Sequence, residues 1–518
     1  MIGERLLERE GEREALMAAL DSALAGAGRL VLVEGEAGRG KTALLGVAGE
    51  LATARGGRVL AAHGGVLERD VAWGVVRQLF EPLVLGPERI EGLIDGPARA
   101  AGPVFGLAPA EPGGPLGGDA TSGAVHALFR VVARLAEAGP VLVSVDDAHW
   151  ADEASLRWLV YVGRRVQRLP VVVAVARRLG EPSGREALLS ELGAVPGATV
   201  VAPPALSAAA AEVLAAESFG TAADPAFTRA CVRATGGNPF LLVELLQALI
   251  ADGASPSAQT AEGVRALRPP AVVADVQRRL GRLSPDANKL AQALAVLDGE
   301  AELRHVVELA ELPLAAGEAA ADELTLARLL AAGRPLRFAH PILRAAVEAE
   351  LPPARRAAAH RRAAAVLDAE PALQDRAAAH LLACEPAADA WVAERLGAAA
   401  RRALARGAPE AAVRLLERAL REPDESWEVH FALGRAHRLA GRLGPAADEL
   451  ALALAGCRRG SARAQIATEL ATALALSGRG VRAWPCSSAS TRPCRVALRG
   501  GSGSRRARSP CACSSTRW

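Results

Sequence analysis

One short run near the N-terminus combines glycines, a lysine and a threonine in a spacing that suits phosphate chemistry. It fits the pattern GxxxxGK[ST] and consists of Gly35, Glu36, Ala37, Gly38, Arg39, Gly40, Lys41 and Thr42. Glycines let successive backbone N–H groups converge on phosphate oxygens. Lys41 can reach the β- and γ-phosphates, and the Thr42 hydroxyl can ligate Mg²⁺. We therefore expect all eight residues to bind ATP or ADP, with Thr42 also contributing to a Mg²⁺ site.

The lysine in this run is one of very few. The chain has 61 basic residues, and only Lys41 and Lys289 are lysines. Such a bias resembles GC-rich coding, in which arginine takes most cationic positions. A lysine is a compact point charge, whereas a guanidinium is a planar fork, so Lys41 has a chemical reason to stand beside a phosphate.

Two further apolar runs end in charged residues. The run 141–145 leads into Asp146 and Asp147. We expect Asp146 to hold Mg²⁺ and Asp147 to orient or deprotonate the attacking water. The run 169–176 ends at Arg177 and Arg178; Arg177 is our candidate to sense the γ-phosphate, and a solvated basic strand end is the alternative. We expect the neighbouring His149 and Trp150 to pack the loop.

The elements that must position these residues follow an alternating pattern. The β-branched run 29–34 precedes the phosphate loop, and a helix is expected to start directly after it. Strands alternate with helices over 30–205, which predicts an α/β P-loop domain with a parallel sheet covered on both faces. Ligands bind at the carboxyl ends of such strands, where all the candidate residues lie.

The rest of the chain is expected to be all-α. Helices are predicted at 207–217, 225–234 and 239–251, with a stop at Gly236-Gly237 and a restart at Pro239. A further helical unit over 271–350 includes an alternating stretch around Leu336 and Phe338 that suits the wing of a small winged helix.

From about 354 the pattern indicates helical hairpins. Gly407 and Gly441 are 34 residues apart, which is the period of tetratricopeptide repeats; unrelated amphipathic helices are the alternative. The predicted organisation is therefore an ATPase domain, a helical lid, a winged-helix-like domain, helical repeats and a basic tail, over 1–205, 206–270, 271–350, 351–478 and 479–518.

Composition and charge exclude several function classes. The 518 residues are 51% hydrophobic but only 3% aromatic, and neither a membrane-spanning run nor a secretory h-region is visible. We expect a cytoplasmic protein with no membrane partner. The net charge is +3, and nine arginines follow Glu469 with no acid among them, so residues 1–469 carry 3 − 9 = −6. This acidic body gives no electrostatic argument for nucleic-acid binding.

The C-terminal tail differs from everything before it. Residues from about 480 onward are rich in Arg, Ser, Pro, Gly and Cys, with no acid and no helical period. Shifting GC-rich alanine and leucine codons by one base yields these residue types. We interpret the tail as frameshifted or otherwise aberrant; a genuine disordered basic tail is the alternative.

Several segments, taken in order, resemble one family. They are Leu7–Glu12, the phosphate loop, Val145–Asp152, Gly236–Leu241 and Phe338–Pro341. The chain resembles, over roughly 5–475, the ATPase region of large ATP-binding regulators of the LuxR family, within the STAND branch of AAA-type NTPases.

The resemblance implies a nucleotide switch that self-associates with ATP and carries an unidentified inducer or protein partner on its repeats. It implies that Pro239 approaches the nucleotide and that His340 touches phosphate in the inactive state, although Pro341 stands where many relatives carry an acid. The family usually ends in a helix-turn-helix DNA-binding domain, and none is visible here. An AAA-type remodeller or replication-initiator-like ATPase acting on nucleic acid, and a repeat scaffold with a vestigial nucleotide site, are the alternatives.

Overall fold

The structure is a computed structural model with two compact units, Met1–Pro423 and Asp424–Trp518. It describes residues 6–85, 92–107, 120–179, 184–265, 283–298, 300–327, 329–339, 341–422 and 426–477. Each unit is treated by itself below. The proposed aberrant tail lies outside the described residues.

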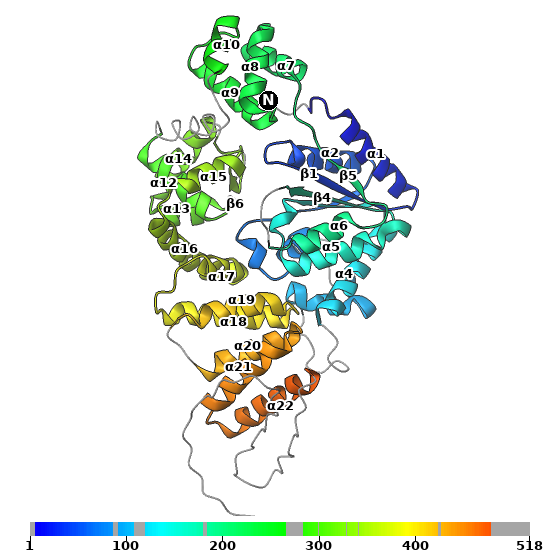
Figure 1. The fold of residues 1–518 in the computed structure, drawn as a ribbon, viewed down its shortest axis with the longest axis vertical. Helices are drawn as coiled ribbons and strands as arrows, with labels where there is room; N and C mark the ends of the chain where they lie inside the picture. The colour runs from blue at the N-terminus through cyan, green and yellow to red at the C-terminus, as the bar shows by residue number, and fades with distance from the viewer. Residues whose placement is uncertain are drawn as a thin grey trace, which may run out of the picture. The chain divides into compact units, whose positions relative to one another are not determined.

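The first unit begins with a five-stranded parallel sheet (Figure 1). Its strands are β1 (Arg29–Gly35), β2 (Arg58–His63), β3 (Val141–Asp146), β4 (Val171–Arg178) and β5 (Thr199–Val201). Their order is β2-β3-β4-β1-β5, and every pairing is parallel. This confirms the predicted α/β sheet and aligns the carboxyl ends of β1, β3 and β4 along one edge.

Helices cover both faces of the sheet (Figure 1). One face is packed by α1 (Glu10–Leu24) and α2 (Lys41–Ala54), whose leucines share a core with Val31 and Val33 of β1. The opposite face is packed by α4 (Ala120–Glu137), α5 (Glu153–Gly163) and α6 (Glu186–Gly193). Burial on both faces explains why the strands have continuous apolar runs instead of alternating ones.

Helix α3 (Gly74–Leu85) follows β2 and precedes a series of short 3₁₀ and irregular connections. The 3₁₀ segments of this unit are η1 (Glu68–Asp70), η3 (Gly96–Phe105), η4 (Ala148–Trp150), η5 (Val166–Arg168) and η6 (Pro371–Leu373).

A group of four helices comes after β5 and has a core of its own around Phe227 and Leu242. The helices are α7 (Ala208–Phe219), α8 (Pro225–Thr235), α9 (Pro239–Ala251) and α10 (Ala258–Arg265). Side-chain oxygens of Ser207, Asp224 and Asn238 accept N–H bonds at the starts of α7, α8 and α9. These caps define the helix starts close to the predicted positions.

The remaining elements of the first unit are helices and one small antiparallel pair. The pair joins β6 (Glu300–Ala301) to β7 (Leu336–Arg337) at the expected wing position. The helices are α12 (Pro285–Val296), α13 (Leu303–Ala310), α14 (Leu314–Leu326), α15 (Pro341–Ala349), α16 (Pro353–Asp368), α17 (Gln374–Leu382), α18 (Ala390–Ala405) and α19 (Pro409–Ala419). One hydrophobic core runs from α12 to α17.

The second unit contains α20 (Trp427–Leu439), α21 (Leu443–Gly456) and α22 (Gly460–Leu476). Helices α20 and α21 pack closely at Gly434, where an added Cβ would stand 2.6 Å from Leu450 Cγ. Within the described part of the chain, no helix combines the length and apolar character that crossing a bilayer requires.

Candidate nucleotide site

The phosphate loop joins the end of β1 to the start of α2. Gly38 and Gly40 have φ angles of 79° and 90°, a region that residues with a Cβ rarely adopt. Lys41 Nζ donates to the carbonyl oxygens of Gly35 (2.9 Å) and Glu36 (2.8 Å). The loop therefore folds around its own lysine, which is only 5% exposed.

The loop is also braced on its outer side. The guanidinium of Arg39 donates to Glu36 Oε2 at 2.8 Å. The carbonyl oxygen of Ala37, in the middle of the loop, accepts a hydrogen bond from Asn238, the residue directly before α9. All eight loop residues thus belong to one continuous structure between a buried strand and a helix N-terminus, which is a site suited to anions.

A hydroxyl and a carboxylate meet at the other end of the site. Thr42 Oγ1 donates to Asp146 Oδ2 at 2.6 Å, although the two residues are 104 positions apart. A hydroxyl beside a carboxylate is the donor set that Mg²⁺ uses in P-loop proteins, in which nucleotide phosphates complete the coordination. Among the described residues, no group of three or more His, Cys, Asp or Glu could hold a metal ion by itself.

Thr42 and Asp146 therefore fit a nucleotide-bound Mg²⁺, which would supply positive charge to the β- and γ-phosphate oxygens. His63, at the end of β2, lies opposite Asp146 in the sheet register, with its Nδ1 4.0 Å from Asp146 Oδ2. The sequence analysis missed His63, because only the strand order places it beside β3.

The two strand-end arginines have different partners. Arg177 pairs with Glu34, the residue opposite it on β1. Arg178 donates to Asp147 Oδ2 at 2.9 Å. Arg178 rather than Arg177 is therefore the arginine that touches the predicted catalytic carboxylate, and the structure places Arg177 beside β1. That distinction depends on the register of β4 against β1.

Asp147 sits on a tight turn. Its φ is 44°, an uncommon conformation for a residue with a side chain. The fully buried His149 follows it; its Nδ1 accepts the N–H of Arg178 at 3.4 Å and lies 3.9 Å from Asp147 Oδ1. His149 thus packs the loop, as predicted, and it also joins the turn to the end of β4.

A residue of the α9 segment contacts the phosphate loop directly. Asn238 Nδ2 donates to the Ala37 carbonyl oxygen at 2.7 Å. An added Cβ on Gly38 would stand 2.5 Å from Asn238 Oδ1, so this approach requires glycine. Pro239 is the next residue and forms the first turn of α9, where it is half-buried.

Asn238 is a site residue that the sequence analysis missed. Asparagine directly before Pro239 is itself a helix-start signal, so a capping role could have been predicted. The contact between its amide and the loop could not. His340, the other residue implied by the resemblance, lies outside the described residues.

The segment before α1 is bonded to the connection between β5 and α7. The buried Arg9 donates to the Pro204 carbonyl oxygen at 2.7 Å, and burial lowers the pKa of its guanidinium. Glu8 accepts the Ser207 N–H at 2.8 Å. Glu8 and Arg9, which belong to the N-terminal segment of the resemblance, therefore join the sheet domain to the start of α7.

Comparison with known proteins relates the N-terminal part of the chain to a family of ATPase domains. Residues 5–175 match the family described as an AAA ATPase domain. The domain that carries the phosphate loop therefore has a P-loop NTPase fold and is similar to AAA-type ATPase domains. The match ends at residue 175 and gives no family for the remainder of the chain.

A curated relative, the uncharacterized protein R02095 of Rhizobium meliloti (strain 1021), is 28% identical over 200 residues. That alignment covers 34% of this chain and 19% of the relative. The chain thus matches about a fifth of the length of that protein.

Two solved structures are also similar to part of this chain, at low sequence identity. The Walker-type ATPase PABY2304 of Pyrococcus abyssi is 15% identical, with a TM-score of 0.32, and the match covers 67% of this chain and 97% of that one. Cdc6p from Pyrobaculum aerophilum is 14% identical, with a TM-score of 0.35, and the match covers 68% and 97%.

Proposed function

We propose that this chain is a nucleotide-dependent switch that binds ATP, hydrolyses it slowly and acts in a transcriptional-regulator context. The observation that carries the proposal is the state of Asp147. Its carboxylate is bonded to Arg178 in a site whose binding residues, Lys41, Thr42 and Asp146, are already assembled.

Binding and hydrolysis place different demands on this site. Phosphate binding needs the loop amides, Lys41 and the Thr42–Asp146 pair, and these lie together. Hydrolysis needs a base within hydrogen-bond reach of a water. Asp147 is engaged with a guanidinium instead, which occupies one of its oxygens. A second arrangement, in which Arg178 releases Asp147, would leave both carboxylate oxygens open to a water, and this supports the proposal of slow hydrolysis and two conformations.

The α9 contact gives the nucleotide a means to act beyond the sheet. Asn238 bonds to the phosphate loop and at the same time caps α9. A change in the loop on nucleotide binding would therefore be felt at the start of that helix. A ligand shifts a two-state equilibrium only by its differential affinity for the two states, and Asn238 provides such a differential contact.

The regulatory context rests on the resemblance to LuxR-family STAND regulators. We infer from it that the helices of 351–478, from α16 onward, act as tetratricopeptide-like repeats that receive an inducer or protein partner. We also infer that the chain self-associates with ATP.

A turnover measurement distinguishes this proposal from its two alternatives. The full chain is incubated with Mg²⁺ and ATP, with and without duplex DNA, and phosphate release is followed. A switch should turn over at roughly 10⁻² s⁻¹ or below, as regulatory P-loop proteins do without an activator, and DNA should not accelerate it. Fast turnover stimulated by DNA would support a remodelling or initiator-like ATPase. Absence of both binding and turnover would support a scaffold.

A further inference from the structure

The segment from Gly64 to Trp73 runs directly from the metal end of the nucleotide site. Gly64 N donates to the Asp146 carbonyl oxygen at 2.9 Å. An added Cβ on Gly64 would stand 2.4 Å from the Asp147 carbonyl oxygen, so the two backbones touch. At its far end, Trp73 N donates to Asp152 Oδ1 at 3.0 Å. The segment is therefore bonded at both ends to the loop that carries the two site aspartates.

Asp152 makes this connection rigid. Its two carboxylate oxygens accept the N–H groups of Trp73 and Val75, and the Oδ1 atom also accepts the N–H of Ser155 at the start of α5. The residue is 3% exposed, and burial raises the pKa of its carboxyl group against the effect of these bonds. A displacement of the aspartate loop would therefore move the Gly64–Trp73 segment with it.

The same segment grips the turn between α18 and α19. The indole of Trp73 is fully buried, and its Nε1 donates to the Arg406 carbonyl oxygen at 2.9 Å. Asp70 pairs with Arg414 of α19, with Oδ1 and Nε 2.8 Å apart. The backbone of Trp73 is thus bonded to Asp152, at the end of the aspartate loop, and its side chain is bonded to the turn between α18 and α19.

A buried carboxylate extends this contact. Asp375 of α17 accepts from Arg77 of α3 at 3.1 Å, from Arg402 of α18 at 2.8 Å, and from Arg406. Burial alone would raise the pKa of Asp375, but the adjacent arginines hold it below its ordinary value. The carboxylate therefore stays ionised and joins α3 of the ATPase domain to α17 and α18.

Two further contacts, from α4 and α5, join the ATPase domain to the same turn and to α19. Thr121 Oγ1 of α4 donates to the Gly407 carbonyl oxygen at 2.5 Å. Arg157 of α5 pairs with Glu410 at the start of α19, at 2.8 Å. We refer to the contacts of Asp70, Trp73, Arg77, Thr121 and Arg157 with α17–α19 as the hairpin clamp.

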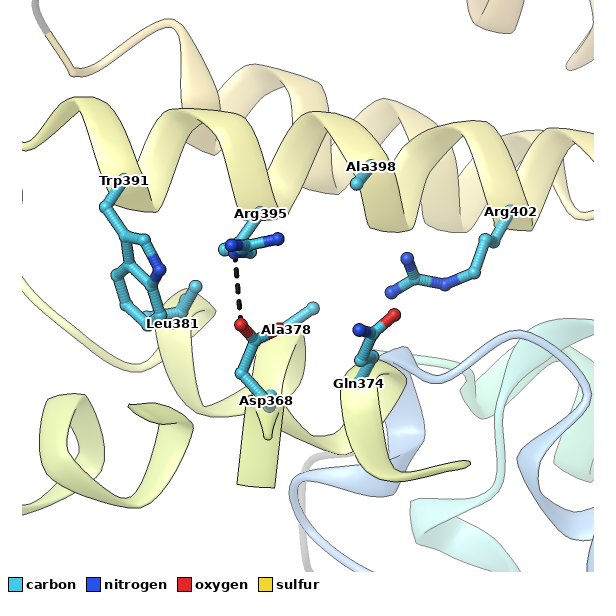
Figure 2. Close-up of a pocket in the computed structure, with 9 residues that line it drawn as sticks. Asp368, Gln374, Ala378, Leu381, Trp391, Arg395, Ala398 and Arg402 are labelled. Atoms are coloured by element: carbon cyan, nitrogen blue, oxygen red, sulfur yellow. Dashed lines mark ion pairs between the residues drawn. The ribbon is translucent and has the colours of Figure 1, made fainter. Parts of the chain in front are cut away.

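Contacts among the helices next to the clamp would let α17–α19 move as one body. Figure 2 shows the side of α18 that packs against α17 and the end of α16, where Arg395 pairs with Asp368 of α16 and the side chain of Arg402 extends toward Gln374. Arg395 Nε lies 3.1 Å from Asp368 Oδ2. The cavity between these residues is about 40 Å³, so there is little space for the two helices to slide against each other.

We propose that the hairpin clamp is the element that the nucleotide site controls, with the Gly64–Trp73 segment transmitting the state of the aspartate loop to α17–α19. This inference rests on the proposed nucleotide switch. In the arrangement described here Asp147 is paired with Arg178, and the clamp is closed. Mg²⁺ and ATP, by drawing on Asp146 and Asp147, favour an arrangement in which the clamp is open and α17–α19 is released.

The proposal makes a reciprocal prediction. If ATP opens the clamp, a weakened clamp must increase the affinity for ATP by the same coupling factor. Asp375→Asn removes the charge that holds three guanidiniums and keeps the shape of the side chain. It should raise the affinity for a non-hydrolysable ATP analogue relative to ADP by about fivefold or more, the lower end of ordinary coupling.

Hydrogen exchange of the full chain tests the structural half of the proposal. Exchange is measured without nucleotide, with Mg²⁺ and ADP, and with Mg²⁺ and the ATP analogue. The analogue should increase exchange several-fold in 64–73 and in 406–410, and ADP should not. Asp375→Asn should show the increase without nucleotide. Glu410→Gln, which breaks a single partly exposed ion pair, should show the same direction more weakly, and it keeps the test valid if Asp375→Asn does not fold.

Asp368→Asn is the matched control. It removes a similarly shielded carboxylate at the end of α16, and the arginine that pairs with it lies on α18 and not in the ATPase domain. It should change neither the exchange of 64–73 nor the nucleotide preference. If both nucleotides bind but exchange stays the same and neither clamp variant alters the ATP/ADP preference, the coupling is wrong and the switch stands. If no nucleotide binds, the proposed function fails and this inference fails with it.

Discussion

Lys41 is the residue on which nucleotide binding should depend most. Its ammonium group donates to two loop carbonyl oxygens. When ATP binds, these hydrogen bonds would be exchanged for bonds to phosphate oxygens, and each such charge-assisted bond is worth about 1.5–3 kcal/mol. We expect Lys41→Ala to weaken ATP binding by at least about 100-fold, as measured by equilibrium binding of a labelled analogue. Lys289→Ala is the matched control, since Lys289 is exposed and pairs with Asp286 on its own helix, at 3.5 Å. Wild-type affinity in Lys41→Ala would refute the assigned phosphate site.

Asp147 should matter for turnover and little for binding. A positioned general base contributes about 10²–10⁴-fold to a rate, whereas Thr42 and Asp146 remain to hold the metal. We expect Asp147→Asn to lower kcat by at least about 100-fold and to change the ATP dissociation constant by less than a few-fold. Equal losses in kcat and in binding would show instead that Asp147 belongs to the binding set.

At this scale the sequence was sufficient where the chemistry is local. The loop from Gly35 to Thr42 and the strand-end Asp146 follow from neighbouring residues, and the structure brings Thr42 and Asp146 together as expected. The choice between Arg177 and Arg178 was not accessible. Successive strand residues point to opposite sides, and only the folded chain shows that Arg177 meets Glu34 of β1 and Arg178 meets Asp147 after β3.

Among the elements, α9 offers a test of how the phosphate loop is supported. Asn238 uses its Oδ1 to cap the helix and its Nδ2 to hold the loop. Asn238→Asp keeps the capping oxygen, removes the donor and places a carboxylate against the Ala37 carbonyl. We expect nearly unchanged helicity by circular dichroism and roughly tenfold weaker nucleotide binding, because a buried acceptor loses its partner at a cost of about 1–3 kcal/mol.

The control for this change separates the two bonds. Asp224 caps α8 in the same group of helices, where its Oδ1 accepts the N–H of Ala226. Asp224→Ala should lower thermal stability by the usual cost of a lost cap, about 0.5–2 kcal/mol, and should leave nucleotide affinity as it is. If Asn238→Asp behaves like Asp224→Ala, the loop contact has no role in binding.

The α16–α17 pair should be sensitive to acid. His360 and His380 share a bond of 3.0 Å between their Nδ1 atoms, which requires one ring to accept. Burial, with Arg356 and Arg344 nearby, lowers the pKa of His360 to about 4. Burial, with His360 and Arg376, lowers the pKa of His380 well below its ordinary value.

The direction of the pH effect follows from these shifts. An unfolded histidine titrates near pH 6.5, so below that pH the unfolded chain binds protons that the folded pair rejects, and stability falls with falling pH. We expect the urea midpoint to fall between pH 7 and pH 5.5. His360→Gln should show a shallower dependence. Equal slopes in the two proteins would contradict the assignment.

Considered as a whole, the molecule shows where sequence-based prediction stopped. The parallel sheet and the helices of 207–251 could be predicted because their apolar patterns and caps are local. The contacts of Trp73 with Arg406 and of Arg77 with Asp375 join residues about 300 positions apart. No periodicity in either segment indicates its partner, so the hairpin clamp could be found only from the folded chain.

A nucleotide switch should exist in two states whose populations depend on which nucleotide is bound. A shift from 1:99 to 99:1 requires about 5.5 kcal/mol of differential binding. Asp147→Asn should remain in the ATP state because it binds ATP without hydrolysing it. We therefore expect this variant to self-associate more readily with ATP than the wild-type chain does.

The most direct test of the central claim is the mass of the full chain in solution, measured by light scattering with ADP and with ATP. Wild type and Asp147→Asn are compared in Mg²⁺, with Lys41→Ala as the variant that should not respond. The account predicts one mass for all three proteins with ADP, and a larger assembly with ATP that is most populated in Asp147→Asn and absent in Lys41→Ala. The same mass for Asp147→Asn with ADP and with ATP, under conditions where both nucleotides are bound, would contradict a nucleotide switch that acts by assembly.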